Sequence, residues 1–403
     1  MLTQEATLEF TRTVQAAPAA VFRAFTTPSA LRDWLCDAAR VDPRSGGPIY
    51  LWWNDGYYTG GVFTAVVRNA ELAFTWRGPQ DPVAGLVHVA LTPTEAGTTV
   101  TVTHTAPEAG PESVTAAAEI ARGWEQSLEN LQSLLETGID LRFACRPMVG
   151  IDDAEVLSPE LAASLGVPIT EGLRLRGLVE GMAAQAGGLQ RDDIMVQLDE
   201  YPITDYQSLA RALQHYQAGD RVPVVFYRGP QRQTLTLELS RRPQPDLPAT
   251  PTALAEVMQA SYAALDAEMA ACFAGAPEEA TAYRPAPDAW NAKEILGHLL
   301  AIEHDTQTWI AAVIEDSDME QTFHTNVTER VAALARIYTP TPVLLEELRR
   351  AEAVTVAMIA ALPAAAVARK HLFNQLATWL TTFADHTREH IAEIQGLLAA
   401  ARP

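Results

Sequence analysis

The sequence predicts a multi-domain chain with an α+β domain at the N-terminus, a β-rich domain in the middle and an all-α four-helix bundle at the C-terminus. Its 403 residues are enough for two to four domains of ordinary size. Short apolar runs separated by turn residues fill residues 1–242 and are typical of strands. Long runs with a helical period fill residues 253–403, and the Pro-rich stretch 243–252 is typical of an extended linker.

The charge and the cysteines exclude several classes of protein. The formal net charge is −21, whereas nucleic acids and anionic membranes are bound by basic surfaces. Cys36, Cys145 and Cys272 show no Cys-x-x-Cys spacing, which is typical of a chain in a reducing compartment. The N-terminal residues lack a signal-peptide pattern, and no apolar run reaches the roughly 18 residues of a membrane span. We therefore expect a cytoplasmic protein without nucleic-acid or membrane partners.

Residues 1–142 alternate a strand, a helix, a series of short strands and a long closing helix. The closing helix has an apolar stripe at helical spacing, which includes Trp124 and Leu128. A sheet that curls around one long helix forms a helix-grip fold, and aromatic residues such as Trp53 and Trp76 either line its cavity or, more commonly, fill its core. The expected ranges are strands at 7–14, 49–53, 57–67, 71–76, 87–91 and 98–105, and helices at 18–34 and 112–136.

Three motifs in this domain resemble a known superfamily. The run Ala17-Pro-Ala-Ala-Val-Phe-Arg-Ala-Phe25, the run Leu31-Arg-Asp-Trp34 and the later run Gly123-Trp-Glu-Gln-Ser-Leu128 are similar to the SRPBCC (START-like) superfamily. The nearest branch is the one named after the heat-shock ATPase activator. The resemblance implies an apolar small molecule in the cavity or a chaperone-related client as the partner, and no catalytic constellation is visible in this domain.

Residues 143–242 combine short strands with one helix that begins at Tyr206. Thr204 and Gln207 have the spacing of a capping box at the start of that helix. The run Gly181-Met-Ala-Ala-Gln-Ala-Gly-Gly-Leu-Gln-Arg-Asp-Asp-Ile194 resembles a bacterial PDZ domain of the HtrA type. The sequence departs from that family at Arg191-Asp192 and at Glu200-Tyr201, both outside the expected peptide groove.

This second resemblance implies that the domain binds the C-terminal peptide of a partner protein. PDZ domains add the peptide as an extra strand and bind its carboxylate with backbone N–H groups. The carboxylate loop would be Met148-Val149-Gly150-Ile151, in which Gly150 lets the backbone come close to the ligand. Leu209 and Leu213 on the helix either face the groove or belong to the core. No protease motif accompanies the domain, so we expect binding only.

The C-terminal residues 253–403 read as a four-helix bundle, which places functional side chains on inward faces. Three histidines interrupt the apolar seams of two of its helices. His386 and His390 lie one turn apart on the last helix, and His298 lies in the seam of an earlier one. Buried imidazoles need partners, because an unsatisfied polar group costs about 1–3 kcal/mol. The expected helices cover 251–273, 291–315, 327–338, 342–361 and 372–400.

The three histidines belong to motifs that resemble a third known family. The run Trp290-Asn-Ala-Lys-Glu-Ile-Leu-Gly-His298, together with His386-x-x-x-His390, is similar to the DinB/YfiT-like bundle family. The resemblance implies that these three histidines bind one divalent metal, with zinc as the first choice and nickel or iron as alternatives. Three protein ligands leave a coordination position open, as in catalytic sites. We expect Glu294, Asp385 or Glu389 to orient the rings.

A competing motif overlaps this pair. His386-Thr-Arg-Glu-His390 also matches H-x-x-E-H, the inverted zinc-peptidase pattern. That pattern needs an acidic ligand well downstream, and only 13 residues follow His390, so we reject it. We expect His304 and His324 on the surface, and the sequence identifies no partner for His371.

Two functions follow from these domains. The first is a bacterial multi-domain adaptor that binds an apolar ligand or client, a C-terminal peptide and a divalent metal. The alternative is a metal-dependent thiol transferase, which the DinB-like resemblance implies. We favour the adaptor, because an active enzyme must satisfy more structural and chemical requirements than a protein that only binds its partners. DinB-like bundles often pair, so a homodimer is compatible with the sequence.

Overall fold

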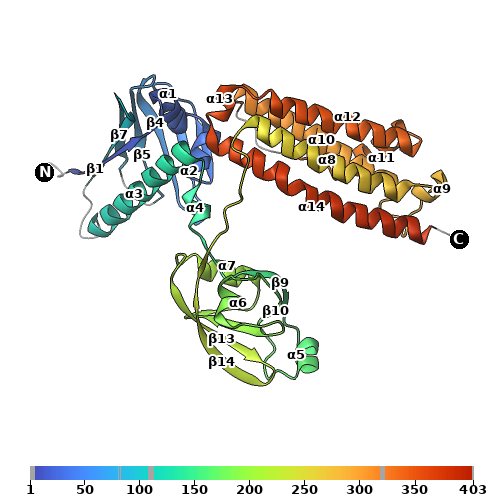
Figure 1. Ribbon diagram of the computed structural model, residues 1–403. Helices are drawn as coiled ribbons and strands as arrows, with labels where there is room; N and C mark the ends of the chain where they lie inside the picture. The colour runs from blue at the N-terminus through green and yellow to red at the C-terminus, as the bar shows by residue number, and fades with distance from the viewer. Residues whose placement is uncertain (1–4, 80, 82, 108–112, 318–322, 402–403) are drawn as a thin grey trace. The chain divides into compact units, whose positions relative to one another are not determined.

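A computed structural model gives the architecture of the chain (Figure 1). It describes residues 5–79, 81, 83–107, 113–317 and 323–401. The chain divides into two compact units, one of residues 1–139 with 245–403 and the other of residues 140–244. The second unit is the β-rich middle region of the chain. Among the described residues, no helix is both long and apolar enough to cross a membrane.

The N-terminal domain is a seven-stranded antiparallel sheet, in the order β1-β7-β6-β5-β4-β3-β2, with three helices. The inner face of the sheet and the last helix, α3, enclose the core, in which Trp34, Phe63 and Leu131 are almost fully buried. The elements are β1 (Glu5–Val14), α1 (Pro18–Thr26), α2 (Pro28–Trp34), β2 (Ala38–Val41), β3 (Pro48–Trp52), β4 (Tyr58–Val67), β5 (Glu71–Trp76), β6 (Gly85–Thr94), β7 (Gly97–Pro107) and α3 (Ser113–Thr137).

The structure corrects two expectations in this domain. The single helix expected over 18–34 is two helices, because Pro28 lacks an N–H and disfavours helical backbone at the residue before it. Thr27 is accordingly extended, with φ −113° and ψ 127°. The short strand β2 was not expected, since its sequence Ala-Ala-Arg-Val has little alternation. The expected start of the closing helix at 112 lies outside the described residues.

The middle unit is built on a six-stranded sheet with the path β14-β13-β11-β10-β9, in which β12 pairs with β11. The strand β9 ends the path, and helix α7 carries the capping box at Asp205 and Ser208, one residue later than the spacing of Thr204 and Gln207 suggested. The elements are α4 (Leu141–Ala144), β8 (Pro147–Met148), β9 (Ile151–Val156), α5 (Pro159–Leu165), β10 (Leu173–Leu178), α6 (Ala183–Gly187), β11 (Ile194–Leu198), β12 (Tyr201–Pro202), α7 (Tyr206–Leu213), β13 (Arg221–Arg228), β14 (Gln231–Glu238) and β15 (Ser240–Arg241).

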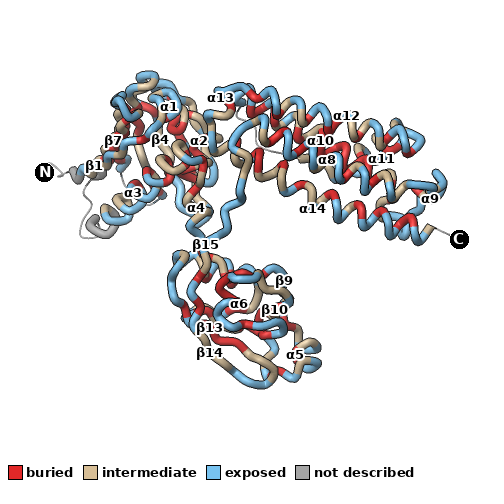
Figure 2. The backbone as a smooth tube through the Cα atoms, in the orientation of Figure 1, coloured by how far each residue is buried: buried red, intermediate tan, exposed pale blue. Residues whose placement is uncertain are grey.

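The C-terminal domain is helical, and its four longest helices pack with their buried residues toward one another (Figure 2). Helix α10 begins at a capping box formed by Asn291 and Glu294, and α8 begins with Pro251 after the cap Thr250. The elements are α8 (Pro251–Phe273), α9 (Glu278–Thr281), α10 (Ala292–Glu315), α11 (Thr328–Ile337), α12 (Thr341–Ala360), α13 (Ala364–Val367) and α14 (Lys370–Ala400). The expected helix boundaries agree with these within three residues.

Candidate metal centre

Helices α10 and α14 bring the three expected histidines together. One nitrogen of each of His298, His386 and His390 lies within 4.8 Å of those of the other two. The Nε2 atoms of His298 and His386 are 3.4 Å apart. Two nitrogens that each lie about 2.0–2.1 Å from one tetrahedral ion are separated by roughly 3.4 Å. The spacing of the imidazoles therefore matches a shared divalent metal.

The outward nitrogens of two rings have oxygen partners. His298 Nδ1 donates to the carbonyl oxygen of Thr325 at 3.0 Å, because a carbonyl can only accept. His390 Nδ1 lies 3.1 Å from a carboxylate oxygen of Glu393, which likewise accepts. A proton on Nδ1 leaves the lone pair on Nε2. Both rings are thereby set in the tautomer that presents Nε2 to the shared point.

One nitrogen that faces this point lacks a hydrogen-bond partner in the part of the chain that the structure describes. His390 Nε2 is buried and has no hydrogen-bond partner among the described residues. An orphaned buried nitrogen is costly, and imidazole lone pairs that face one another repel. A cation at their shared point would satisfy them together, so the residues present fit a metal.

The centre is closed on one side and open on the other. His298 is 3% exposed, whereas the side chain of His386 is 42% exposed. The ring centre of Trp290 lies 5.1 Å from that of His298, and the ring centre of Phe383 lies 5.5 Å from that of His386. The ring of Trp379 stacks on that of Phe383, with their centres 5.9 Å apart. A three-histidine set with one accessible ligand leaves room for water or a substrate.

Burial favours the neutral form of two of the rings, those of His298 and His386. The pKa of His298 is lowered from its ordinary value mainly by burial and further by His390 and His386, against the raising effect of the Thr325 carbonyl. The pKa of His386 is lowered by burial and by His390. Only neutral imidazole binds a metal, so both rings are in the ligating form at neutral pH.

A clamp formed by Asp305 and Arg330 fixes the segment that supplies the Thr325 carbonyl. Asp305 Oδ2 accepts from the backbone N–H of His324 at 2.8 Å, and Arg330 Nη1 donates to the His324 carbonyl at 3.2 Å. Arg330 also pairs with Asp305 at 2.8 Å and donates to the Ala301 carbonyl at 3.2 Å. Both backbone polar groups of His324 are therefore held immediately before the residue whose carbonyl His298 contacts.

We expect Arg330→Ala to weaken metal binding by about tenfold, the lower end of what partners of ligating histidines contribute. The reason is that the His298 tautomer loses its fixed acceptor. Titration calorimetry with Zn²⁺ on the full chain measures the change. The matched control is Arg336→Ala, an exposed residue of the same helix, α11. Equal affinities for the two variants would show that the clamp does not orient His298.

The groups expected to orient the rings differ from the groups that contact them. Glu389 lies 3.9 Å from His386 Nδ1, which is too long for a hydrogen bond, so it does not fix that ring. Glu294 instead caps α10 and pairs with Arg284, and Asp385 pairs with Arg388, so these two predictions were wrong. Glu393 was missed, although its position three residues after His390 places it one turn along the same face. The Thr325 carbonyl could not be predicted from the sequence, because every residue has a backbone carbonyl whatever its side chain.

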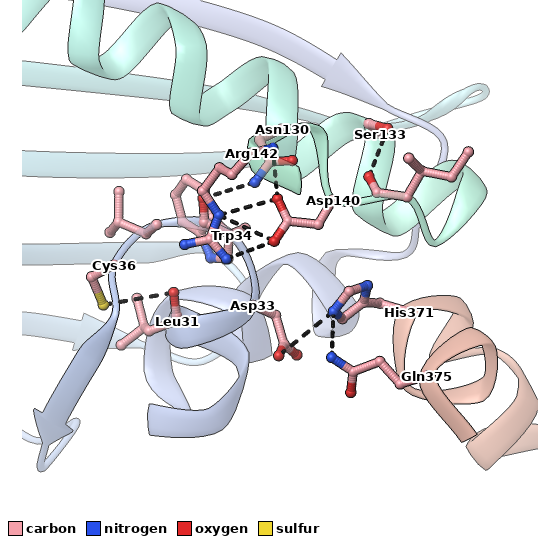
Figure 3. A network of polar contacts seen from close by, with 12 residues as sticks. Leu31, Asp33, Trp34, Cys36, Asn130, Ser133, Asp140, Arg142, His371 and Gln375 are labelled. Carbon is pink, nitrogen blue, oxygen red and sulfur yellow. Dashed lines mark hydrogen bonds and ion pairs between the residues drawn. The ribbon is translucent and has the colours of Figure 1, made fainter. Parts of the chain in front are cut away.

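The remaining histidines of the bundle lie outside the centre. His304 is half-buried on α10, and its pKa is lowered by burial and by Arg330. The sequence identified no partner for His371, but its ring has partners in the structure. Its Nδ1 lies 3.0 Å from the Gly138 carbonyl, and its Nε2 lies 2.9 Å from the Gln375 amide and 3.9 Å from Asp33 (Figure 3).

All six residues predicted to bind a peptide line one groove of about 480 Å³ in the middle unit. Gly150 has φ +83°, and a Cβ there would lie 2.3 Å from Met182 Cβ, so only glycine fits. Leu209 both lines the groove and belongs to the core, while Leu213 packs against that core, so groove and core roles are not exclusive. The six are Met148, Val149, Gly150, Ile151, Leu209 and Leu213.

In the N-terminal domain, aromatic rings are packed against one another. The ring of Trp76 lies 6.2 Å from that of Trp53 and 5.8 Å from that of Trp124. Trp124 Nε1 donates to the buried His104 Nδ1 at 3.0 Å, and burial lowers the pKa of His104 to about 4. Trp124 belongs to the core, and Trp53 and Trp76 are partly buried and pack against it.

Comparison with known families supports two of the three domains. Residues 15–136 match the family described as activator of Hsp90 ATPase homolog 1-like protein, and residues 261–394 match the DinB superfamily. The chain therefore carries a domain of each kind. DinB-like domains are metal-binding, which agrees with the three-histidine cluster. No curated protein matches the chain.

Several solved structures are similar to part of the chain. Protein MLL2253 from Mesorhizobium loti is 27% identical, with 32% of this chain and 97% of that one covered at a TM-score of 0.31. Protein SSP2350 from Staphylococcus saprophyticus is 23% identical, with 34% and 96% covered at 0.30. The Aha1 dimer from Colwellia psychrerythraea is 20% identical, with 32% and 96% covered at 0.30.

Proposed function

We propose that this chain is a multi-domain binding protein whose C-terminal domain binds one divalent metal through His298, His386 and His390. The observation that carries the proposal is the buried, unpartnered Nε2 of His390 beside the two other imidazoles. Zinc is the first choice, with nickel or iron as alternatives, since imidazole suits all three. The hydrogen bonds that Nδ1 of His298 and of His390 donate, and the open side at His386, support this assignment.

The same geometry is compatible with catalysis as a metal-dependent thiol transferase. A metal bound here would lower the pKa of a bound thiol or water and so supply a nucleophile near neutral pH. The protein itself would contribute orientation through Thr325 and Glu393, and exclusion of water by Trp290 and Phe383. The exposed edge of His386 is the route by which a substrate would enter.

The direct test is metal analysis of the purified full chain after dialysis against Zn²⁺, Ni²⁺ or Fe²⁺. We expect one equivalent of metal per chain. A metal content indistinguishable from that of a dialysis blank would remove both the metal-binding proposal and the thiol-transferase alternative.

The groove of the middle unit supports a second function, capture of a free C-terminal peptide by strand addition. Strand β9 lies at the end of the sheet order and so offers an edge to an added strand. Within the described residues, the N–H groups of Val149 and Gly150 donate to no other backbone carbonyl. Two free N–H groups at a left-handed glycine suit a carboxylate.

The binding of an apolar ligand or a client by the N-terminal domain, and the formation of a homodimer, remain predictions.

We expect C-terminal peptides with a free carboxylate to bind the full chain, and the same peptides amidated to bind at least tenfold more weakly. The reason is that only the carboxylate accepts from the N–H groups of the loop. Gly150→Ala should abolish binding, because its Cβ would overlap Met182. Fluorescence anisotropy on a panel of labelled peptides measures both effects, with Gly229→Ala in the unobstructed β13–β14 turn as the control for the loss of a left-handed glycine. Equal binding of free and amidated peptides would contradict the proposal.

A further inference from the structure

The groove of the middle unit has a charge opposite to that of the chain. Of the sixteen residues that line it, three are arginines and none is acidic. The chain as a whole carries a formal net charge of −21. A cationic groove on an acidic chain is selective, because acidic ligands are repelled elsewhere and attracted here.

Two of the three arginines have no carboxylate to neutralise them. Arg142 forms an ion pair with the buried Asp140 at 2.8 Å, so its charge is already matched. In the part of the chain that the structure describes, no ion pair involves Arg146 or Arg242. Both side chains are exposed, and the Arg146 guanidinium lies 4.7 Å from the centre of the Phe143 ring, which restricts where it points.

Both free guanidiniums lie at the carboxylate end of the groove. Arg146 is two residues before Met148, and Arg242 directly follows β15, whose Ser240 pairs with Met148. Successive side chains of an extended peptide point to opposite sides. When the last side chain enters the groove toward Leu209 and Leu213, the penultimate one points to the exposed rim. The rim at this end of the groove carries the two arginines.

We propose that the groove selects C-terminal peptides with an apolar last residue and an acidic penultimate residue, read by Arg146 and Arg242. This inference rests on the proposed capture of free C-termini. The apolar lining of Val149, Ile151 and Leu209 takes the last side chain, while the guanidiniums meet the carboxylate beside it.

The test compares three otherwise identical ten-residue peptides that end in Glu-Leu, Ala-Leu and Lys-Leu with a free carboxylate. Fluorescence anisotropy with the full chain should show the order Glu-Leu, Ala-Leu, Lys-Leu, with about tenfold between the first and the last. Raising NaCl to about 0.5 M should narrow that ratio, since exposed charges are screened. The variant carrying Arg146→Gln and Arg242→Gln should bind all three peptides within about twofold. Arg232→Gln, an exposed arginine on β14 away from the groove, is the matched control and should keep the full ratio.

Each outcome has one meaning. Equal affinities for the Glu-Leu and Lys-Leu peptides would overturn the acidic selectivity and leave peptide capture intact. An unchanged ratio in the double variant would overturn the assignment to these two arginines. Failure of every free-carboxylate peptide to bind would overturn peptide capture and this inference together.

Discussion

Replacing His390 with alanine is expected to reduce divalent-metal affinity by at least about 100-fold, because even groups that only orient ligating histidines contribute 10–100-fold. The variant also removes His390 Nε2, which is buried without a hydrogen-bond partner among the described residues, so the need for an ion at this point disappears with it. Titration calorimetry and metal analysis after dialysis measure the loss. Wild-type protein at a metal concentration of 100 Kd should gain about 2.7 kcal/mol of stability, and the variant should gain almost none.

His304→Ala is the control, since His304 lies on the same helix as His298 but outside the cluster. It should keep one equivalent of metal and the full stabilisation. Circular dichroism of each metal-free variant checks that the helices are intact. If His390→Ala and His304→Ala bound metal equally, the three imidazoles would not form the site.

The histidine cluster could be predicted from sequence because helical periodicity is a local property. Two histidines four residues apart share a face, and an apolar seam on either side shows that this face is inward. The same logic gave the bounds of α8 and α14. What the pattern could not show is the rotation that brings His298 of α10 against them, which tertiary packing decides.

The parts that escaped prediction depend on backbone geometry or on distant partners. The Thr325 carbonyl contacts His298 in a segment where Asp305 and Arg330 hold the backbone of the preceding residue, His324. The break at Pro28, by contrast, was readable from the residue itself, since proline disfavours helix at the position before it. The cationic rim of the groove could not be predicted from the sequence, because it depends on the pairing of β15 with β8, which brings together residues about 90 positions apart.

A buried group of acids in the bundle leads to the second large prediction. Glu352 on α12 is 8% exposed, and its Oε2 has no hydrogen-bond partner among the described residues. Glu303 on α10 is also buried, but Tyr262 donates to one of its oxygens at 2.8 Å and Thr355 to the other at 2.6 Å. Burial first, and then the carboxylates of Asp266 and Glu303, raise the pKa of Glu352 to about 9, against the lowering effect of Arg349.

The raised pKa makes stability depend on pH with a definite sign. In the unfolded chain Glu352 titrates near its ordinary value of 4.5, whereas in the folded chain it keeps its proton up to about pH 9. Between these values the folded state binds more protons, so the free energy of unfolding falls as pH rises. The slope approaches on the order of 1 kcal/mol per pH unit at most. Below pH 4.5 Glu352 is protonated in both the folded and the unfolded state, so it contributes nothing to the slope of stability against pH.

Glu352→Gln should remove the part of the slope that Glu352 contributes, because an amide of the same shape does not ionise, while Glu303 and Asp266, whose pKa values burial also raises, keep their own contributions. We expect the variant to match the wild type near pH 4.5 and to exceed its stability by a few kcal/mol near pH 9. Urea unfolding from pH 5 to pH 9, with a chelator present, measures the difference, and hydrogen exchange of α12 amides assigns it to the bundle. Glu346→Gln, half-exposed on the same helix, should leave the slope unchanged. Parallel pH profiles for wild type and Glu352→Gln would mean that Glu352 is ionised at neutral pH, with a cation or ordered water beside it.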